Sequence, residues 1–206
     1  MRAPMIIAIL IFGLVSTALA EDSPPKITLK VPADWKGERI PLPPTFARDM
    51  KLTGTEEARF SPGMFQEKSD TFFSYLFVFQ VEPKTELTQK VIKDELLTYY
   101  RGLSRTIFKS RNVKVDTDSF AVKIKQSKPK KPQKSVPAGL KQYDGSVTWI
   151  EPFVTQKRQT LTLEIQSWTD KKTGHGYLFV CASPKETTAE IWKTMRNIRG
   201  TFHREN

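Results

Sequence analysis

The residues whose type and spacing stand out most are lysines in the second half of the chain. Six of them fall within twelve residues, with no acidic residue among them: Lys123, Lys125, Lys128, Lys130, Lys131 and Lys134. Such a run attracts anions through screened electrostatics, without a fixed geometry. We therefore predict an anion-binding surface, with Trp149 and Trp168 on later strands as candidates to stack on a ligand. Two other interpretations stay open: lysines that keep a loop soluble, or lysines that protect an edge strand from aggregation.

Side chains that could catalyse a reaction are sparse. The histidines are His175 and His203, and the one cysteine is Cys181. There is no metal-ligand motif, Gly-rich phosphate loop or G-x-S-x-G nucleophile motif, so we expect no metal and no cofactor. A carboxylate pair, as in glycoside hydrolysis, is an alternative, because Glu151 and Glu164 lie on adjacent predicted strands. A solvated sheet face explains these glutamates better, and we expect a non-catalytic protein.

Cys181 stands alone, so no disulfide can form within the chain and stability must come from packing. It lies in the apolar run 177–182, which predicts a buried strand. We expect its thiol to act as a small hydrophobic side chain. A reactive or intermolecular role is the alternative, and it would require exposure and a lowered pKa.

The first twenty residues have the pattern of an export signal. Arg2 gives a positive start, residues 6–15 form a short apolar core, and residues 18–20 (Ala-Leu-Ala) form a small-x-small cleavage site. The apolar run is too short to span a bilayer comfortably, and no second one follows. We expect cleavage between Ala20 and Glu21 and a periplasmic or secreted protein without a transmembrane segment in its mature chain. A segment that stays as an uncleaved anchor is the alternative.

Removal of residues 1–20 leaves a flexible leader at 21–25 and enough chain for one globular domain at 26–206. It also leaves 32 basic residues against 22 acidic ones, a net charge of +10. Outside the cytoplasm, an anionic polymer or an acidic envelope protein is a better partner for this charge than nucleic acid. Residues 127–135 combine lysine and proline with no apolar residue, which predicts an exposed loop.

Alternating apolar residues predict β-strands along most of the chain. The strongest strand is at 72–81, where aromatic and aliphatic residues fill both faces, so we predict a central strand covered on each side. An exposed aromatic platform for a ligand is the alternative. Residues 35–46 are rich in proline, so we expect them to be extended or irregular. The other strands are predicted at 27–31, 56–60, 120–124, 147–153, 160–168 and 177–182, the last three as a meander.

A long helix is predicted at about 85–108. Its apolar residues recur every three or four positions, which gives one stripe along the helix. Gly102 lies within this pattern and would allow a close approach to the sheet. The stripe consists of Ile92, Leu96, Tyr99, Leu103 and Ile107.

A second helix is predicted after the last strand. Ser183 fits the N-cap, Pro184 the first helical position, and Glu186 completes an S-x-x-E capping box. Gly200 fits the position where the helix ends. The inward-facing residues are predicted to be Ile191, Met195 and Ile198, with Trp192 beside them.

This order of elements predicts an α+β domain. A mainly antiparallel sheet would be covered by the long central helix and the C-terminal helix. With its closing apolar strand, its capped helix and the final Thr201-Phe202, the chain resembles the small exported α/β/α sandwiches of the PsbP and Mog1 type over about two-thirds of its mature length. The resemblance implies an assembly, accessory or binding role, although a fold alone does not settle function.

The sequence therefore favours an exported, non-catalytic binding or accessory protein that uses a basic surface. Two alternatives remain: an extracytoplasmic polymer hydrolase with carboxylate catalysis, and a structural partner in a larger assembly. A pocket with two close carboxyl groups would favour the hydrolase. An exposed apolar patch beside the helices would favour the assembly partner.

Overall fold

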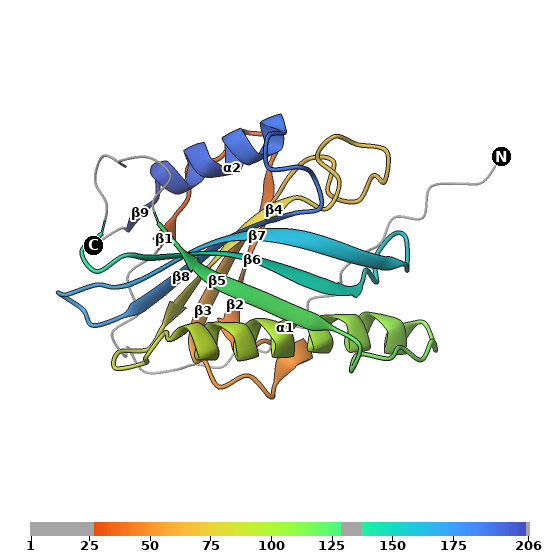
Figure 1. The fold of residues 1–206 in the computed structure, drawn as a ribbon, viewed down its shortest axis with the longest axis horizontal. Helices are drawn as coiled ribbons and strands as arrows, with labels where there is room; N and C mark the ends of the chain where they lie inside the picture. Colours follow the sequence, from red (N-terminus) through yellow and green to blue (C-terminus); the bar gives the residue numbers. More distant parts are fainter. Residues whose placement is uncertain (1–26, 129–136, 205–206) are drawn as a thin grey trace, which may run out of the picture.

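Two helices cover opposite faces of one β-sheet (Figure 1). The structure is a computed structural model that describes residues 27–128 and 137–204. The long helix α1 (Gln89–Ser110) lies on one face and the shorter helix α2 (Glu190–Gly200) on the other. This α+β arrangement of an antiparallel sheet with two packed helices confirms the predicted fold class.

The main sheet has seven strands in the order β2-β3-β4-β8-β7-β6-β5, and every neighbouring pair is antiparallel. A separate two-stranded ribbon pairs β1 (Ile27–Thr28) with β9 (His203–Arg204). A short 3-10 helix, η1 (Thr45–Ala47), follows β2. The strands of the main sheet are β2 (Lys36–Leu42), β3 (Gly54–Phe60), β4 (Tyr75–Val81), β5 (Ala121–Ser127), β6 (Lys141–Ile150), β7 (Arg158–Thr169) and β8 (Gly176–Ser183).

Strand β4 is the buried centre that the sequence predicts. All seven of its residues are buried. Tyr75, Phe77 and Phe79 pack in the core beneath α1, while Leu76 and Val78 pack in the core beneath α2. The aromatic row is therefore core, and the alternative of an exposed aromatic platform is wrong. The strand begins three residues later than predicted, after a turn in which Phe73 has a φ of 48°.

Helix α1 buries the predicted stripe in part. Ile92, Leu96 and Tyr99 are buried, whereas Leu103 and Ile107 are only partly covered. Gly102 does allow a close approach, but the sequence predicted the wrong neighbour for it. This glycine lies against η1 and not against the sheet, because a Cβ there would come within 2.8 Å of the Cα of Ala47.

Helix α2 begins later than its capping box predicts. Ser183 is the last residue of β8, and the helix starts at Glu190 after Ala189, which makes no side-chain capping bond. The buried hydroxyl of Ser183 lies 2.7 Å from the hydroxyl of Ser74 and accepts a hydrogen bond from the backbone N–H of Lys185, so it closes a turn after β8 and does not cap the helix. The predicted inward-facing residues of this helix are confirmed as buried: Ile191, Trp192, Met195 and Ile198.

The proline-rich stretch 35–46 was expected to be extended or irregular, and most of it is extended, in strand β2. An edge strand tolerates Pro41, because a proline at the edge can direct its nitrogen away from the neighbouring strand. The expected export signal (1–20) and leader (21–25) lie outside the described residues. In the part of the chain that the structure describes, no helix has the length and apolar character needed to cross a membrane.

Candidate functional site

The described lysines of the basic run lie on and beside strand β5, which forms one edge of the sheet. Lys123 and Lys125 are exposed, while Val122 and Ile124, which alternate with them, pack into the core beneath α1. Because side chains alternate along a strand, the two lysines point to the other face, the one that carries α2. Lys125 pairs in register with the acidic residue Asp144 on β6.

Lys128 follows the end of β5 and belongs to a different surface. Ser127 pairs with Gln142, so Lys128 comes next to Lys141 in register. Both positions are exposed and lie, by alternation, on the α1 side of the sheet. The basic run is thus divided between the two faces. The remaining three candidates lie outside the described residues: Lys130, Lys131 and Lys134.

Lys141 helps to line a pocket of about 530 Å³ at this end of the sheet. The pocket lies between the β4–α1 connection, the start of β6 and the β7–β8 hairpin. Lys84 supplies a second ammonium group and Glu86 the one carboxylate of the lining. Four hydroxyl side chains complete the polar lining, those of Thr85, Thr88, Ser167 and Thr169. Two ammonium groups and several hydroxyls are donors suited to an anionic ligand.

The backbone around this pocket is unusual. Three of its lining residues have left-handed φ angles: Lys84 at 68°, Gly139 at 73° and Gly174 at 74°. Glycine adopts this conformation freely, but a residue with a Cβ, such as Lys84, loses roughly 1–2 kcal/mol there. Such conformations concentrate at functional sites.

The two tryptophan candidates lie in different places, and neither is beside Lys123 or Lys125 on the exposed face of β5. Trp149 is fully buried against Phe73 and Tyr100, so the ligand-stacking role expected for it is wrong. Trp168 is partly exposed and lines the pocket. Its ring, however, stacks on Tyr177 at 5.2 Å within the α2-side core, so one of its faces is already covered.

Glu151 and Glu164 are both buried, so the solvated sheet face expected for them is wrong. Glu151 accepts backbone hydrogen bonds from Phe153, Val154 and Thr155 and thereby holds the β6–β7 turn. Glu151 follows the end of β6 and lies seven residues from Asp144, the partner of Glu164. At about 3.3 Å per residue this is a separation of roughly 23 Å along the strand. The two carboxylates therefore cannot act on one bond as the hydrolase alternative requires.

Glu164 is instead the partner of helix α2. Its carboxylate accepts hydrogen bonds from Arg196 at 2.7 Å and from Arg199 at 3.1 Å. The guanidinium of Arg196 also lies over the ring of Trp192, 5.6 Å from its centroid. These contacts fix the helix on the sheet, which makes them structural.

Cys181 is fully buried on β8, as expected for a small hydrophobic side chain. Burial raises the pKa of its thiol to about 11, which disfavours the reactive thiolate. His175 lies in the β7–β8 hairpin and is partly exposed, and the side chain of His203 lies outside the described residues. Among the described side chains, no group of three or more His, Cys, Asp or Glu could hold a metal ion.

Three buried carboxyl groups were missed by sequence reasoning, and one of them, Glu57 on β3, belongs to a second hollow described below. Glu56 on β3 is 1% exposed, and Glu95 on α1 accepts hydrogen bonds from the backbone of Lys51 and Leu52. Burial, with a smaller contribution from the charge of Glu38, raises the pKa of Glu56 to about 8 against the lowering effect of a hydrogen bond from Tyr99. Glu56 lies within a stretch that was predicted to be a strand, but neither its burial nor its neighbours could be read from the sequence.

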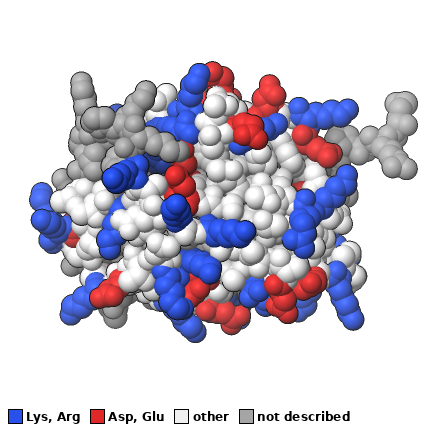
Figure 2. Space-filling model, in the orientation of Figure 1, with Lys and Arg blue, Asp and Glu red and all other residues white. Residues whose placement is uncertain are grey.

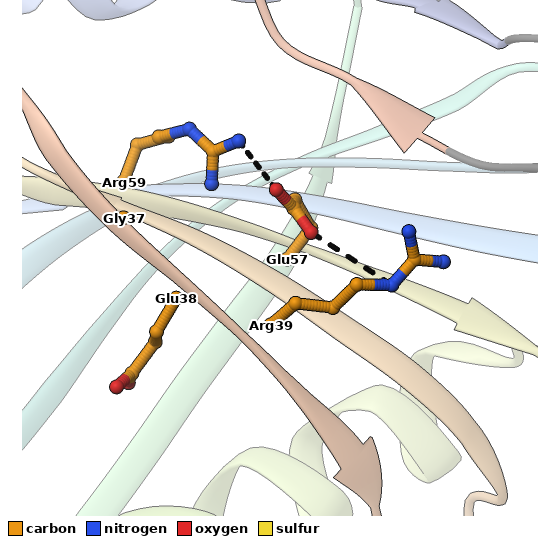
Figure 3. A pocket seen from close by; sticks show the side chains of 5 residues that line it. All are labelled: Gly37, Glu38, Arg39, Glu57 and Arg59. Carbon is orange, nitrogen blue, oxygen red and sulfur yellow. Dashed lines mark hydrogen bonds and ion pairs between the residues drawn. The ribbon is translucent and has the colours of Figure 1, made fainter.

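A second, shallower hollow of about 320 Å³ lies at the opposite edge of the sheet, on β2 and β3. Figure 3 shows Arg39 and Arg59 on either side of Glu57, with Glu38 pointing to the other side of β2. Arg59 forms an ion pair with Glu57, and Nε of Arg39 lies 3.9 Å from the same carboxylate.

The charged residues do not gather into a single patch on the face seen in Figure 2. Lysine and arginine side chains lie around its whole outline, with acidic side chains between them. The positive charge of the chain is therefore spread on this face, and a basic site must be defined by local geometry such as the lysine-lined pocket.

No protein-family model matches this sequence, and no curated protein matches it. Solved structures with a similar fold include cyanobacterial PsbP (CyanoP) from Synechocystis sp. PCC 6803, at 9% identity, with 93% of this chain and 98% of that chain covered and a TM-score of 0.39. LpqN, involved in cell envelope biogenesis of Mycobacterium tuberculosis, is 10% identical, with 90% and 87% covered and a TM-score of 0.34. The Ran-binding protein Mog1p of Saccharomyces cerevisiae is 9% identical, with 82% and 95% covered and a TM-score of 0.33. At these identities and TM-scores the likeness supports no statement about function.

Proposed function

We propose that this chain is an exported, non-catalytic binding or accessory protein that holds an anionic partner at the pocket between α1 and the end of the sheet. The observation that carries the proposal is that Lys84 and Lys141 line the same pocket of about 530 Å³. The export pattern of residues 1–20 supports a partner outside the cytoplasm, and we propose that residues 26–206 act there as one domain.

The charge of the whole chain supports the same proposal. A net charge of +11 raises the local concentration of anions around the molecule, and the pocket then supplies directed donors.

The test measures binding of tripolyphosphate, a small probe, and of polygalacturonate, a polymeric one, to the full chain at low and high salt. Replacing Lys84 and Lys141 together by Gln should weaken binding of both probes by about tenfold and flatten its salt dependence, because two ammonium groups are lost. A double Lys109→Gln, Lys114→Gln variant is the matched control, since both lysines are exposed and lie at and just beyond the other end of α1.

The outcome that contradicts the proposal is equally clear. If the two double variants weaken binding equally, net charge explains the effect and the pocket has no special role. If affinity is the same at low and high salt, the interaction is not electrostatic and the basic surface is not the binding surface.

A further inference from the structure

We propose that the free edge of β2 binds an extended acidic segment of a partner protein, with Arg39 receiving one of its carboxylates. This surface lies at the opposite edge of the sheet from β5, and it does not depend on the lysine-lined pocket. Four observations carry the proposal: the open edge of β2, the spare donors of Arg39, the space left by Gly37, and the net positive charge of the chain.

The first observation is the open edge. Every residue of β2 pairs with β3, and no strand among the described residues pairs with its other side. Residues 36–39 are exposed. Pro41 has no N–H, and in edge strands its nitrogen faces away from the neighbouring strand. We therefore expect Gly37 and Arg39, which share its orientation, to direct their N–H and C=O groups to the open side, where an added strand would bond to them.

The second observation is the arrangement of charges in the hollow, whose lining holds two carboxyl groups, Glu38 and Glu57, and two guanidinium groups, Arg39 and Arg59. One buried carboxylate, that of Glu57, lies between two guanidinium groups (Figure 3). Arg59 already has two acceptors, because it pairs with Glu57 and also donates a 2.7 Å hydrogen bond to the carbonyl oxygen of Ala58. Arg39 only approaches Glu57, at 3.9 Å, and its side chain is 36% exposed. Glu57 thus holds Arg39 in place while leaving the donors of its guanidinium fork available to a second carboxylate.

The third observation is the space beside Arg39. Gly37, two residues away on the same face, has no side chain, and a Cβ there would come within 2.8 Å of the carbonyl oxygen of Ala58 and still closer to the guanidinium of Arg59. The absence of that Cβ lets Arg59 lie across β2 and leaves the hollow of about 320 Å³ next to Arg39. A carboxylate side chain from an added strand fits this space.

The fourth observation decides the kind of partner. A second copy of this chain would bring its own +11 charge and its own Lys36 and Arg39 to the same edge, which opposes pairing. A segment with acidic residues at every second position presents carboxylates on one face, towards Arg39, and is attracted by the field of the whole molecule. An acidic extended segment is therefore the occupant that the charges favour.

The experiment uses the full chain and a capped octapeptide of alternating Thr and Glu, with the Thr-Gln peptide as the uncharged control. Amide chemical shifts locate the binding site, and titration gives the affinity. We expect shifts on β2 and β3, and about tenfold weaker binding for the Thr-Gln peptide. Arg39→Gln should weaken binding of the Thr-Glu peptide by a similar factor. Lys36→Gln, which removes the same charge from the same exposed strand, should have much less effect.

Any one of the following results would contradict the proposal. Equal losses for Arg39→Gln and Lys36→Gln would mean that charge alone attracts the peptide. Shifts confined to β5 or to the lysine-lined pocket would place the peptide elsewhere, and a peptide that does not bind would leave the edge without this partner. Shifts on β2 that grow with protein concentration in the absence of peptide would identify a second copy as the occupant.

Discussion

The hydroxyl of Tyr99 on α1 donates a 2.9 Å hydrogen bond to Oε1 of Glu56 on β3, and this bond joins the long helix to the sheet inside the core. The other carboxyl oxygen, Oε2, has no hydrogen-bond partner among the described residues. Burial raises the pKa of Glu56 to about 8, so the carboxyl is protonated at neutral pH. The helix is therefore attached to the sheet through an acid that must stay neutral.

The first prediction concerns the pH dependence of stability. The pKa of Glu56 is about 8 in the folded protein and about 4.5 in the unfolded chain, so the folded state holds a proton that the unfolded state has lost. The contribution of Glu56 to the free energy of unfolding should fall as pH rises from about 4.5 to about 8, by on the order of 5 kcal/mol in total. Urea unfolding at pH 5, 7 and 9 measures this fall.

Glu56→Gln should remove that part of the pH dependence, because an amide does not ionise in this range. Glu67→Gln is the control, since Glu67 is exposed and its replacement should leave the slope unchanged. Identical slopes for the original chain and for Glu56→Gln would show that Glu56 does not carry a raised pKa.

The second prediction concerns Gly102. Alanine is a better helix former than glycine by about 1 kcal/mol, but a Cβ at this position would meet the backbone of η1 at 2.8 Å or less. Gly102→Ala should therefore destabilise the protein by about 2 kcal/mol, as overpacking does. The matched control is Gly200→Ala at the end of α2, where a Cβ meets nothing within 4 Å and stability should be unchanged or slightly higher. Thermal unfolding of both variants compares them, and a stabilised Gly102→Ala would refute the close contact.

The third prediction concerns Glu151 in the β6–β7 turn. Its two carboxylate oxygens accept hydrogen bonds from three backbone N–H groups and from the hydroxyl of Thr155. In Glu151→Gln an amide NH₂ replaces one acceptor and faces an N–H donor, so we expect a loss of about 2–4 kcal/mol in the free energy of unfolding. Thr155→Val removes one of these bonds and should cost only about 1 kcal/mol. Equal small losses in the two variants would mean that the carboxylate does not hold the turn.

The fourth prediction concerns Cys181. Because the thiol is fully buried and its pKa is raised to about 11, iodoacetamide at pH 8 should leave the folded protein unmodified. The same reagent should modify the chain fully in urea. Intact mass measurement distinguishes the two states. Rapid labelling of the folded protein would instead support a reactive thiol, the alternative role for Cys181.

Much of the fold follows from periodicity alone. The alternation around Phe77 defines the central strand, and the three- and four-residue spacing around Leu96 defines α1, because both patterns reflect which side chains must be buried. The start of α2 did not follow, since the hydroxyl of Ser183 accepts from Lys185 in a turn before the helix and is also in contact with Ser74, 109 residues away. A contact between residues so far apart in the chain cannot be predicted from the residues around Ser183.

The candidate site was predicted only in part, for a related reason. The lysine run identified Lys128 from the sequence. Lys84 and Lys141 come from other segments, and they line one pocket only because the fold brings these segments to the same end of the sheet. The burial of Trp149 likewise depends on Phe73 and Tyr100, which lie far from it in sequence. Charge density can be read along the chain, whereas a pocket is a property of the folded arrangement.

The ribbon of β1 and β9 has a mechanical consequence. Ile27 pairs with Arg204, so the described chain enters and leaves the molecule at neighbouring points (Figure 1). A force pulling these two points apart acts directly across the ribbon and opens its two residue pairs in succession, before any tension reaches the seven-stranded sheet. The ribbon is thus the first part of the described structure to carry the load, ahead of the layers between α1 and α2.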